Sequence, residues 1–172
     1  MGKTMKIAVV SDSHDNLGNI RRAVEDIKKR QLNVVVHAGD IISPFALKLF
    51  QGLKLYAVFG NNDGERMLLT KIAEKYGFIL EEQPLFLSLE EYRVAVIHGV
   101  DGADKTRRFA YVLAKSGEFD AVIYGHLHEA EVKRIGSTLV LNPGELSGYL
   151  FGKASYAVLD LEELSAEIVL LK

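Results

Sequence analysis

The chain has 172 residues, of which 48% are hydrophobic and 26% charged; these values are ordinary for a globular protein and predict one domain spanning residues 1–172. Its formal net charge of −2 provides no basic field for nonspecific nucleic-acid binding, and we expect no stable nucleic-acid complex. The absence of cysteine excludes disulfide bonds and thiolate zinc sites, so any metal ion must bind through imidazole, carboxylate, amide or water.

Short apolar runs alternate with segments of helical periodicity along the first part of the chain. The runs at 7–10, 34–36, 55–59, 94–97 and 121–124 are typical of buried strands. Apolar residues spaced three and four apart predict helices at 16–30, 65–76 and 104–116. Ser43-Pro44, a typical helix start, predicts a short helix at 44–50. The inward faces that we expect for the last two helices are Leu68, Leu69, Ile72 and Ala73, and Phe109, Val112 and Leu113.

Further strand patterns follow at 85–89 and, late in the chain, at 130–135, 138–142, 154–161 and 166–171. Early βα alternation with late consecutive strands predicts an α/β fold, a four-layer α-β-β-α sandwich. Two mixed β-sheets would pack face to face with the helices outside. No segment reaches the roughly 20 apolar residues of a membrane span, and we expect no membrane association. The first apolar stretch is too short for a signal peptide, so we expect a cytoplasmic protein.

Each of the five early runs ends, within a few residues, in a residue type that binds metals. The residues in question are Asp12, His14, Asp40, Asn61, His98, His126 and His128. Ligands of open α/β sheets bind beyond the carboxyl ends of the strands, so these side chains should meet at one edge of the molecule. Five such endings in one short chain indicate a polynuclear metal site.

Taken singly, each of these residues has a structural explanation. Asp12 and Asp40 could cap helices or turns, and His14 could be a surface histidine. Four of the five histidines nevertheless fall at these strand ends, which favours the metal site. We expect the fifth, His37, to be partly buried and hydrogen-bonded. Asp63 should cap a helix or orient the Asn61 loop.

The order of these motifs resembles the calcineurin-like metallophosphoesterase superfamily. The residues that carry the resemblance are Asp12-x-His14, Gly39-Asp40, Gly60-Asn61-Asn62-Asp63, His98 and Gly125-His126-Leu127-His128. The later Asn142-Pro143-Gly144-Glu145 and the compact length are similar to the small archaeal and bacterial phosphodiesterases related to YfcE. Glu145 itself, like Asp15, is interpreted as a surface or loop carboxylate.

The resemblance implies two divalent metal ions. Asp12, His14 and His128 would bind one ion, Asn61, His98 and His126 the other, and Asp40 would bridge them. The implied reaction is hydrolysis of a small phosphodiester by in-line attack of a metal-bridging hydroxide, with Asp40 and Asn62 as catalytic residues. Oxygen and imidazole ligands suit Mn, our first choice, and also Ni, Zn, Fe or Co, rather than Ca.

Asn62 departs from the pattern of many superfamily members, which carry a histidine there that is thought to protonate the leaving group. An amide donates hydrogen bonds but cannot serve as a general acid. We therefore expect slow cleavage of alkyl esters and faster cleavage of diesters with acidic leaving groups.

Two other functions compete with a phosphodiesterase. A non-catalytic metal-binding interaction scaffold of the same fold is possible, although all candidate ligands are intact. A repair nuclease is disfavoured because the chain lacks a basic surplus and a DNA-facing extra domain. Lys105, Arg107 and Arg108 fit a solvated helix face better than a phosphate-binding one. The apolar late strands and residues 146–151 could line the interface of a homodimer or higher homo-oligomer, but core packing explains them equally well.

Overall fold

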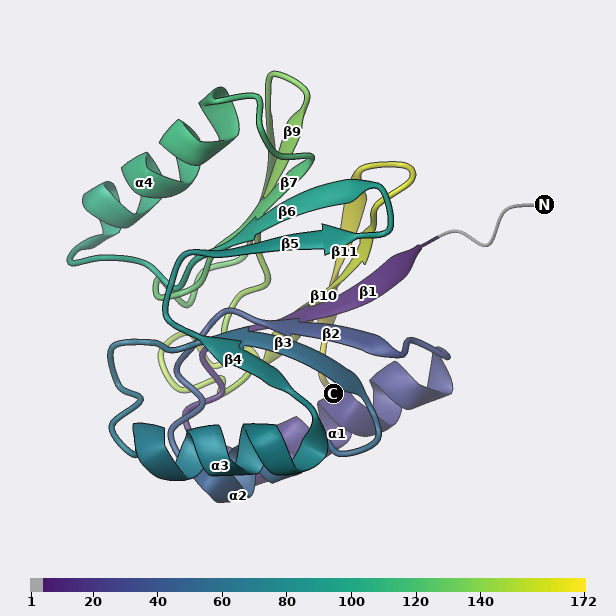
Figure 1. Ribbon diagram of the computed structural model, residues 1–172, viewed down its shortest axis with the longest axis vertical. Helices are drawn as coiled ribbons and strands as arrows, with labels where there is room; N and C mark the ends of the chain where they lie inside the picture. Colours follow the sequence, from purple (N-terminus) through teal and green to yellow (C-terminus); the bar gives the residue numbers. More distant parts are fainter. Residues whose placement is uncertain (1–4) are drawn as a thin grey trace.

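Two β-sheets stack face to face in the computed structural model, which describes residues 5–172 (Figure 1). The first sheet has the strand order β11 (Ser165–Leu170), β10 (Ser155–Asp160), β1 (Lys6–Val10), β2 (Val34–His37), β3 (Lys54–Val58) and β4 (Ile79–Glu81). The second has the order β5 (Leu85–Leu89), β6 (Tyr92–Val96), β7 (Ala121–Ile123), β9 (Thr138–Asn142) and β8 (Glu131–Ile135). Residues 1–4 lie outside the described part of the predicted domain 1–172, which stays a prediction.

Both sheets mix parallel and antiparallel pairs. Strands β1, β2, β3 and β4 run parallel, whereas β10 is antiparallel to β1 and to β11. In the second sheet β6, β7 and β9 are parallel, and β5 and β8 are antiparallel edge strands. Because the carboxyl ends of β1, β2 and β3 share an edge, the loops that follow them lie together.

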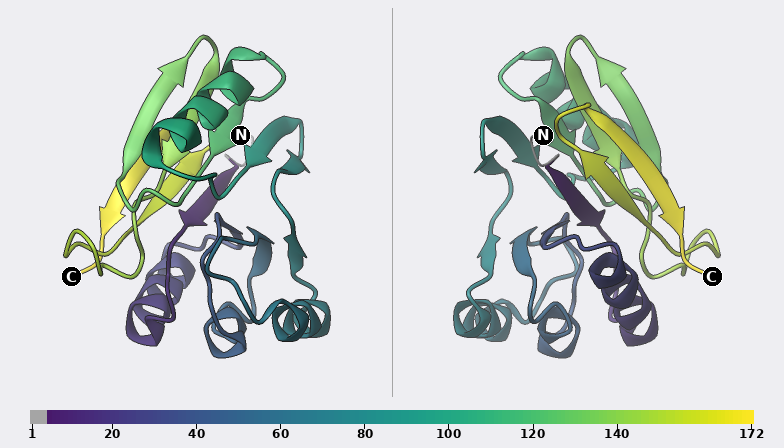
Figure 2. Two further views of the ribbon diagram at one scale, coloured as in Figure 1. Left: turned by 90° about the vertical axis from the view of Figure 1, so that its left-hand side faces the viewer. Right: turned by 90° about the vertical axis from the view of Figure 1, so that its right-hand side faces the viewer.

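Helices cover the outer face of each sheet. Helices α1 (Leu17–Lys29), α2 (Pro44–Lys48) and α3 (Arg66–Tyr76) lie side by side against the first sheet, and α4 (Ala103–Lys115) covers the second (Figure 2). The predicted four-layer α-β-β-α sandwich is therefore confirmed.

Strand β1 shows why the apolar runs are continuous rather than alternating. Ile7 and Val9 enter the core between the two sheets, while Ala8 and Val10 enter the core under α1, α2 and α3. A strand buried on both faces needs apolar residues at every position. A third apolar cluster, which includes Ala110 of α4, seals the outer face of the second sheet.

The helix ends follow local sequence signals. Ser43 caps α2 by accepting a hydrogen bond from the Ala46 N–H, with Pro44 at the first helical position. Helix α3 ends at Gly77, whose φ of 69° lies in the left-handed region that glycine adopts easily.

Two expected helix faces are partly wrong. Leu68 is 45% exposed and Val112 is 59% exposed, so neither belongs to the core. Helix α3 packs instead through Leu69 and Ala73, and α4 packs closely through its small residues Thr106, Ala110 and Ala114. The sequence pattern also does not predict the short edge strand β4. Among residues 5–172, no helix combines the length and apolar character needed to cross a lipid bilayer.

Candidate metal centre

The loops after β1, β2, β3, β6 and β7 meet at one edge of the sandwich. Backbone hydrogen bonds tie them together: the Asp12 N–H donates to the Gly39 carbonyl over 3.0 Å, and the Gly125 N–H donates to the His98 carbonyl over 2.9 Å. The His126 N–H donates to Asp12 Oδ2 over 3.0 Å and so joins the loops of the two sheets. Strand ends from both sheets therefore build one site.

Asp12, His14 and His128 form the first group of converging side chains. His128 Nε2 lies 3.3 Å from Asp12 Oδ1 and 3.2 Å from His14 Nε2. Burial acts to raise the pKa of Asp12, but His14, whose Nε2 lies 3.7 Å from Asp12 Oδ1, and the other neighbouring histidines hold that pKa below its usual value. The nearby Asp12 carboxylate in turn raises the pKa of His14. Asp12 is thus ionised at neutral pH, as a metal ligand must be.

Asp40, Asn61, His98 and His126 form the second group. His98 Nε2 lies 3.5 Å from Asp40 Oδ2, 2.8 Å from Asn61 Oδ1 and 3.2 Å from His126 Nδ1. Asp40 Oδ2 also lies 3.3 Å from His14 Nε2, which connects this group to the first. The seven candidate ligands thus form one continuous cluster with Asp40 between its two halves.

The spacing of these atoms fits shared metal ions. Donors on one ion with bonds of about 2.1 Å lie about 3.0 Å apart in octahedral and about 3.4 Å apart in tetrahedral geometry. The contacts given above, from 2.8 to 3.5 Å, match that range. Among the described residues, Asp12 Oδ1 is a buried oxygen without a hydrogen-bond partner, and it faces His14 and His128. A buried carboxylate oxygen left without a donor is costly, and a cation at this point would satisfy it.

In three of the histidines, the ring nitrogen that faces away from the cluster lies within hydrogen-bond distance of an oxygen. His98 Nδ1 lies 2.7 Å from the Ala38 carbonyl, and His126 Nε2 lies 2.6 Å from the Asp101 carbonyl. His128 Nδ1 lies 2.6 Å from Glu145 Oε2. Each acceptor requires the proton on that nitrogen, which leaves the nitrogen inside the cluster free to bind a metal.

Glu145 lies in the loop between β9 and β10, but it is not a surface carboxylate. It is 1% exposed and accepts hydrogen bonds from His128 and from the Leu150 and Phe151 N–H groups. Burial acts to raise its pKa, but the Phe151 N–H and His128 outweigh that effect and lower the pKa below its usual value. The other carboxylate, Asp15, is exposed as expected and accepts a hydrogen bond from Ser43 Oγ.

Asn62 contacts the cluster through Asp40. Its side-chain amide donates to Asp40 Oδ2 and its backbone N–H donates to Asp40 Oδ1, both over 2.9 Å. The neighbouring Asp63 accepts backbone hydrogen bonds from Asp40, Ile41, Ile42 and Gly60. Asp63 thus orients the Asn61 loop and joins it to the Asp40 loop, and it is not the cap of α3, which begins without a side-chain cap.

His37 is fully buried and hydrogen-bonded, more deeply than the sequence suggested. Its Nδ1 accepts from the Gly39 N–H over 3.1 Å, which places the proton on Nε2, and Nε2 lies 2.9 Å from Ser13 Oγ. Burial lowers the pKa of His37 to about 3. His37 is thus a neutral support behind the Asp40 loop.

The backbone of the site is strained and tightly packed. Five of the candidate ligands have a positive φ: Asp12 (50°), His14 (41°), Asp40 (61°), His126 (69°) and His128 (61°). This left-handed conformation costs free energy in residues other than glycine, and residues that adopt it cluster at functional sites. Glycines let the loops approach: a Cβ at Gly60 would lie 2.2 Å from Asp40 Oδ1, and one at Gly125 would lie 2.1 Å from Ser11 Oγ.

The basic residues that open α4 form ion pairs on the surface. Lys105 pairs with Asp101 at 2.5 Å, and Arg107 pairs with Glu129 at 3.0 Å. Arg108 is exposed. This arrangement favours the solvated helix face.

A model of the calcineurin-like phosphoesterase superfamily domain matches residues 5–164. The chain therefore belongs to this superfamily of phosphoesterases, and the resemblance noted in the sequence is confirmed. Phosphodiesterase MJ0936 of Methanocaldococcus jannaschii is 39% identical over 173 residues, 96% of this chain and 99% of that protein. A solved structure of a novel archaeal phosphodiesterase is 34% identical, covers 97% of this chain and 100% of its own, and has a TM-score of 0.88. The phosphoesterase YfcE from E. coli, 20% identical with a TM-score of 0.64 and coverage of 98% and 100%, shares the fold.

Proposed function

We propose that this protein is a dinuclear metal-dependent phosphodiesterase acting on a small phosphodiester. The observation that carries the proposal is the continuous cluster of candidate ligands around Asp40, with the unpaired buried oxygen of Asp12 facing two imidazoles. A family that includes metallophosphoesterases supports divalent ions as the cofactor. Mn is our first choice, with Ni, Zn, Fe and Co also suited to carboxylate and imidazole ligands.

The proposed roles follow from the contacts. Asp12, His14 and His128 would hold one ion, Asn61, His98 and His126 the other, and Asp40 would bridge the two. When bound, two such ions activate water and stabilise the charge that develops on a phosphoryl group. Asn62 positions Asp40 and presents a neutral amide at the cluster, which can donate a hydrogen bond to a phosphoryl oxygen but cannot protonate a leaving group.

The experiment uses metal-stripped protein reconstituted separately with Mn, Ni, Zn, Mg or no metal. Each sample is assayed on bis-p-nitrophenyl phosphate and on p-nitrophenyl phosphate. Asp40→Ala removes the proposed bridge, and Asp104→Asn, an exposed carboxylate on α4, is the matched control. Circular dichroism and thermal melting verify that both variants fold.

We expect diester cleavage that depends on metal, is lost in Asp40→Ala and is retained in Asp104→Asn. Binding of two ions per chain without turnover of either substrate would contradict the phosphodiesterase and support the interaction scaffold. Binding of one ion would contradict the dinuclear arrangement. The cytoplasmic location and the oligomeric state stay predictions.

A further inference from the structure

A cavity of about 320 Å³ adjoins the candidate metal ligand His128. Its other walls include Phe151 and Lys153 from the segment between β9 and β10, and Ile168 and Leu170 from β11. Figure 2 shows that segment beside the C-terminus, and the Leu171 N–H donates to the Ala154 carbonyl over 2.9 Å. The cavity therefore borders the candidate metal cluster through one residue that belongs to both, His128.

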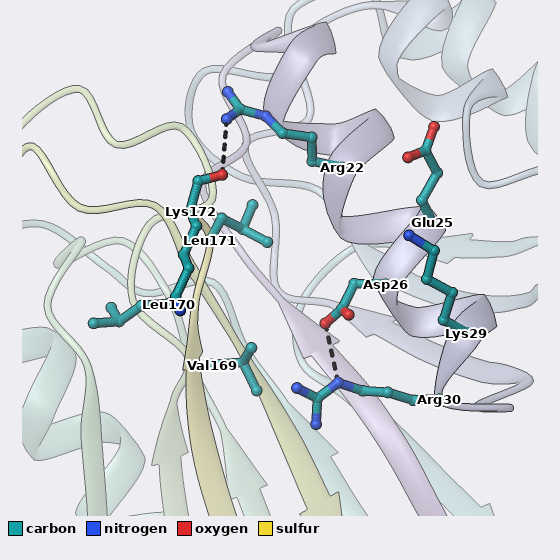
Figure 3. A pocket seen from close by; sticks show the side chains of 9 residues that line it. All are labelled: Arg22, Glu25, Asp26, Lys29, Arg30, Val169, Leu170, Leu171 and Lys172. Atoms are coloured by element: carbon teal, nitrogen blue, oxygen red, sulfur yellow. Dashed lines mark hydrogen bonds and ion pairs between the residues drawn. The ribbon is translucent and has the colours of Figure 1, made fainter.

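Another cavity of about 370 Å³, between α1 and the end of β11, contrasts with it (Figure 3). Both of its arginines already have partners: Arg30 donates to Asp26 over 3.0 Å, and Arg22 donates to the Lys172 carbonyl over 3.2 Å. None of the candidate metal ligands lines it. It offers no connection to the proposed chemistry.

The cavity beside His128 is held in a fixed relation to the metal cluster. Glu145 accepts from His128 Nδ1 through one oxygen and from the Phe151 N–H over 2.7 Å through the other. The Ser147 N–H also donates to the Asp12 carbonyl over 3.1 Å. The wall that carries Phe151 is thus preorganised by the residues that orient the metal ligands.

The lining combines apolar side chains with a lysine, and its one acidic residue, Glu129, pairs with Arg107 over 3.0 Å. Phe151 is 58% exposed and Leu170 57% exposed, which leaves an aromatic ring and a branched side chain without cover. Within residues 5–172, no carboxylate forms an ion pair with the exposed Lys153. The volume lies at the lower end of the range of small-molecule pockets, about 300–1,000 Å³, and suits one ring rather than a large ligand.

We propose that this cavity binds an aromatic ester group of the phosphodiester, stacked on Phe151, with a negatively charged ring substituent directed to Lys153. The inference rests on the proposed function, since it requires the phosphoryl group to lie at the metal cluster. It narrows the substrate class to aryl or similarly planar diesters that carry a further acidic group.

Binding of phosphonates, which are not hydrolysed, tests the cavity independently of turnover. Phenylphosphonate, methylphosphonate and 4-carboxyphenylphosphonate are titrated calorimetrically into Mn-loaded protein. We expect phenylphosphonate to bind about tenfold more tightly than methylphosphonate, as a stacked ring contact allows. Phe151→Ala should abolish that preference, and Lys153→Gln should remove the added affinity of the carboxylated ring. Phe86→Ala, a control on the distant edge strand β5 with a ring 57% exposed, should keep both.

Equal affinity for the phenyl and methyl compounds, or no binding of either, would overturn the inference. A second result would also overturn it: sedimentation shows a dimer that Phe151→Ala dissociates, while the phosphonate selectivity of the variant is unchanged. In that case a second copy of the chain covers the ring. Turnover of bis-p-nitrophenyl phosphate is measured in parallel. Turnover without a preference for the phenyl compound would support the phosphodiesterase and contradict the aryl-binding cavity. A preference for the phenyl compound without turnover would support the aryl-binding cavity and contradict the phosphodiesterase.

Discussion

Glu145 fixes the ring of His128 by accepting a 2.6 Å hydrogen bond from its Nδ1. The two residues are 17 positions apart in the sequence and lie on different loops of the site. The contact keeps the proton on Nδ1 and directs Nε2 to the cluster. Carboxylates in this position orient metal-binding histidines and increase their basicity.

Replacing Glu145 with alanine should weaken metal binding about 10–100-fold, the usual cost of losing such a partner. Calorimetric titration of Mn into metal-stripped protein measures the affinity for each ion and checks this prediction. Glu129→Ala is the matched control, because Glu129 neighbours His128 but pairs with Arg107 on the surface. Unchanged affinity in Glu145→Ala would mean that His128 is oriented by other contacts.

Replacing Asn62 with histidine should restore a general acid at the position where this chain has an amide. We expect the natural enzyme to lose rate steeply as the pKa of the leaving group rises. Asn62→His should reduce that dependence and accelerate alkyl esters by up to about 10²–10⁴-fold. Rates across a series of aryl and alkyl diesters provide the measurement.

Asn62→Ala is the control for that series, since it also loses the amide contact with Asp40 but gains no acid. A flat dependence on leaving-group pKa in the natural enzyme would refute the idea that the missing acid limits the rate.

Replacing Asp63 with asparagine should destabilise the loops that hold Asp40 and Asn61. The carboxylate accepts from four backbone N–H groups, and an amide would turn one of those acceptors into a donor. We expect a loss of about 2–4 kcal/mol in the free energy of unfolding, because buried donors lose a charged acceptor. Urea denaturation measures it, with Asp104→Asn as the exposed control. A change below about 0.5 kcal/mol, typical of surface substitutions, would show that the loops are held by other contacts.

His37 should make stability depend on pH. Its pKa is about 3 in the folded protein and 6.5 when unperturbed, so between these values the unfolded chain binds a proton that the folded chain does not. Stability is therefore full above about pH 6.5 and falls, as pH is lowered, by about 1.4 kcal/mol per pH unit. His37→Gln keeps a donor for Ser13 but does not titrate. The loss of unfolding free energy between pH 7.5 and 5 should be about 2 kcal/mol larger in the natural protein than in this variant. Equal losses would show that His37 is protonated in the folded state.

Residue types at strand ends were enough to find the cluster, because buried strands with continuous apolar runs deliver whatever follows them to one edge. Glu145 was missed because nothing within a few positions of it reveals the contact with His128. The predicted buried faces of α3 and α4 are partly wrong for a different reason. Leu68 and Val112 have the size of core residues, but contact is decided by which stripe of the helix meets the sheet. In α4 that stripe consists of small residues such as Ala110, which bring the helix close.

The left-handed backbone at five of the candidate ligands has a consequence for transplanting the site. A peptide copying residues 11–14 would relax to ordinary torsions, and Asp12 and His14 would then point elsewhere. The geometry exists only while both sheets hold their loops in place, so the proposed metal site requires the folded chain. Bound ions should in turn raise the melting temperature, and any graft of this site would need the complete double-sheet framework beneath it.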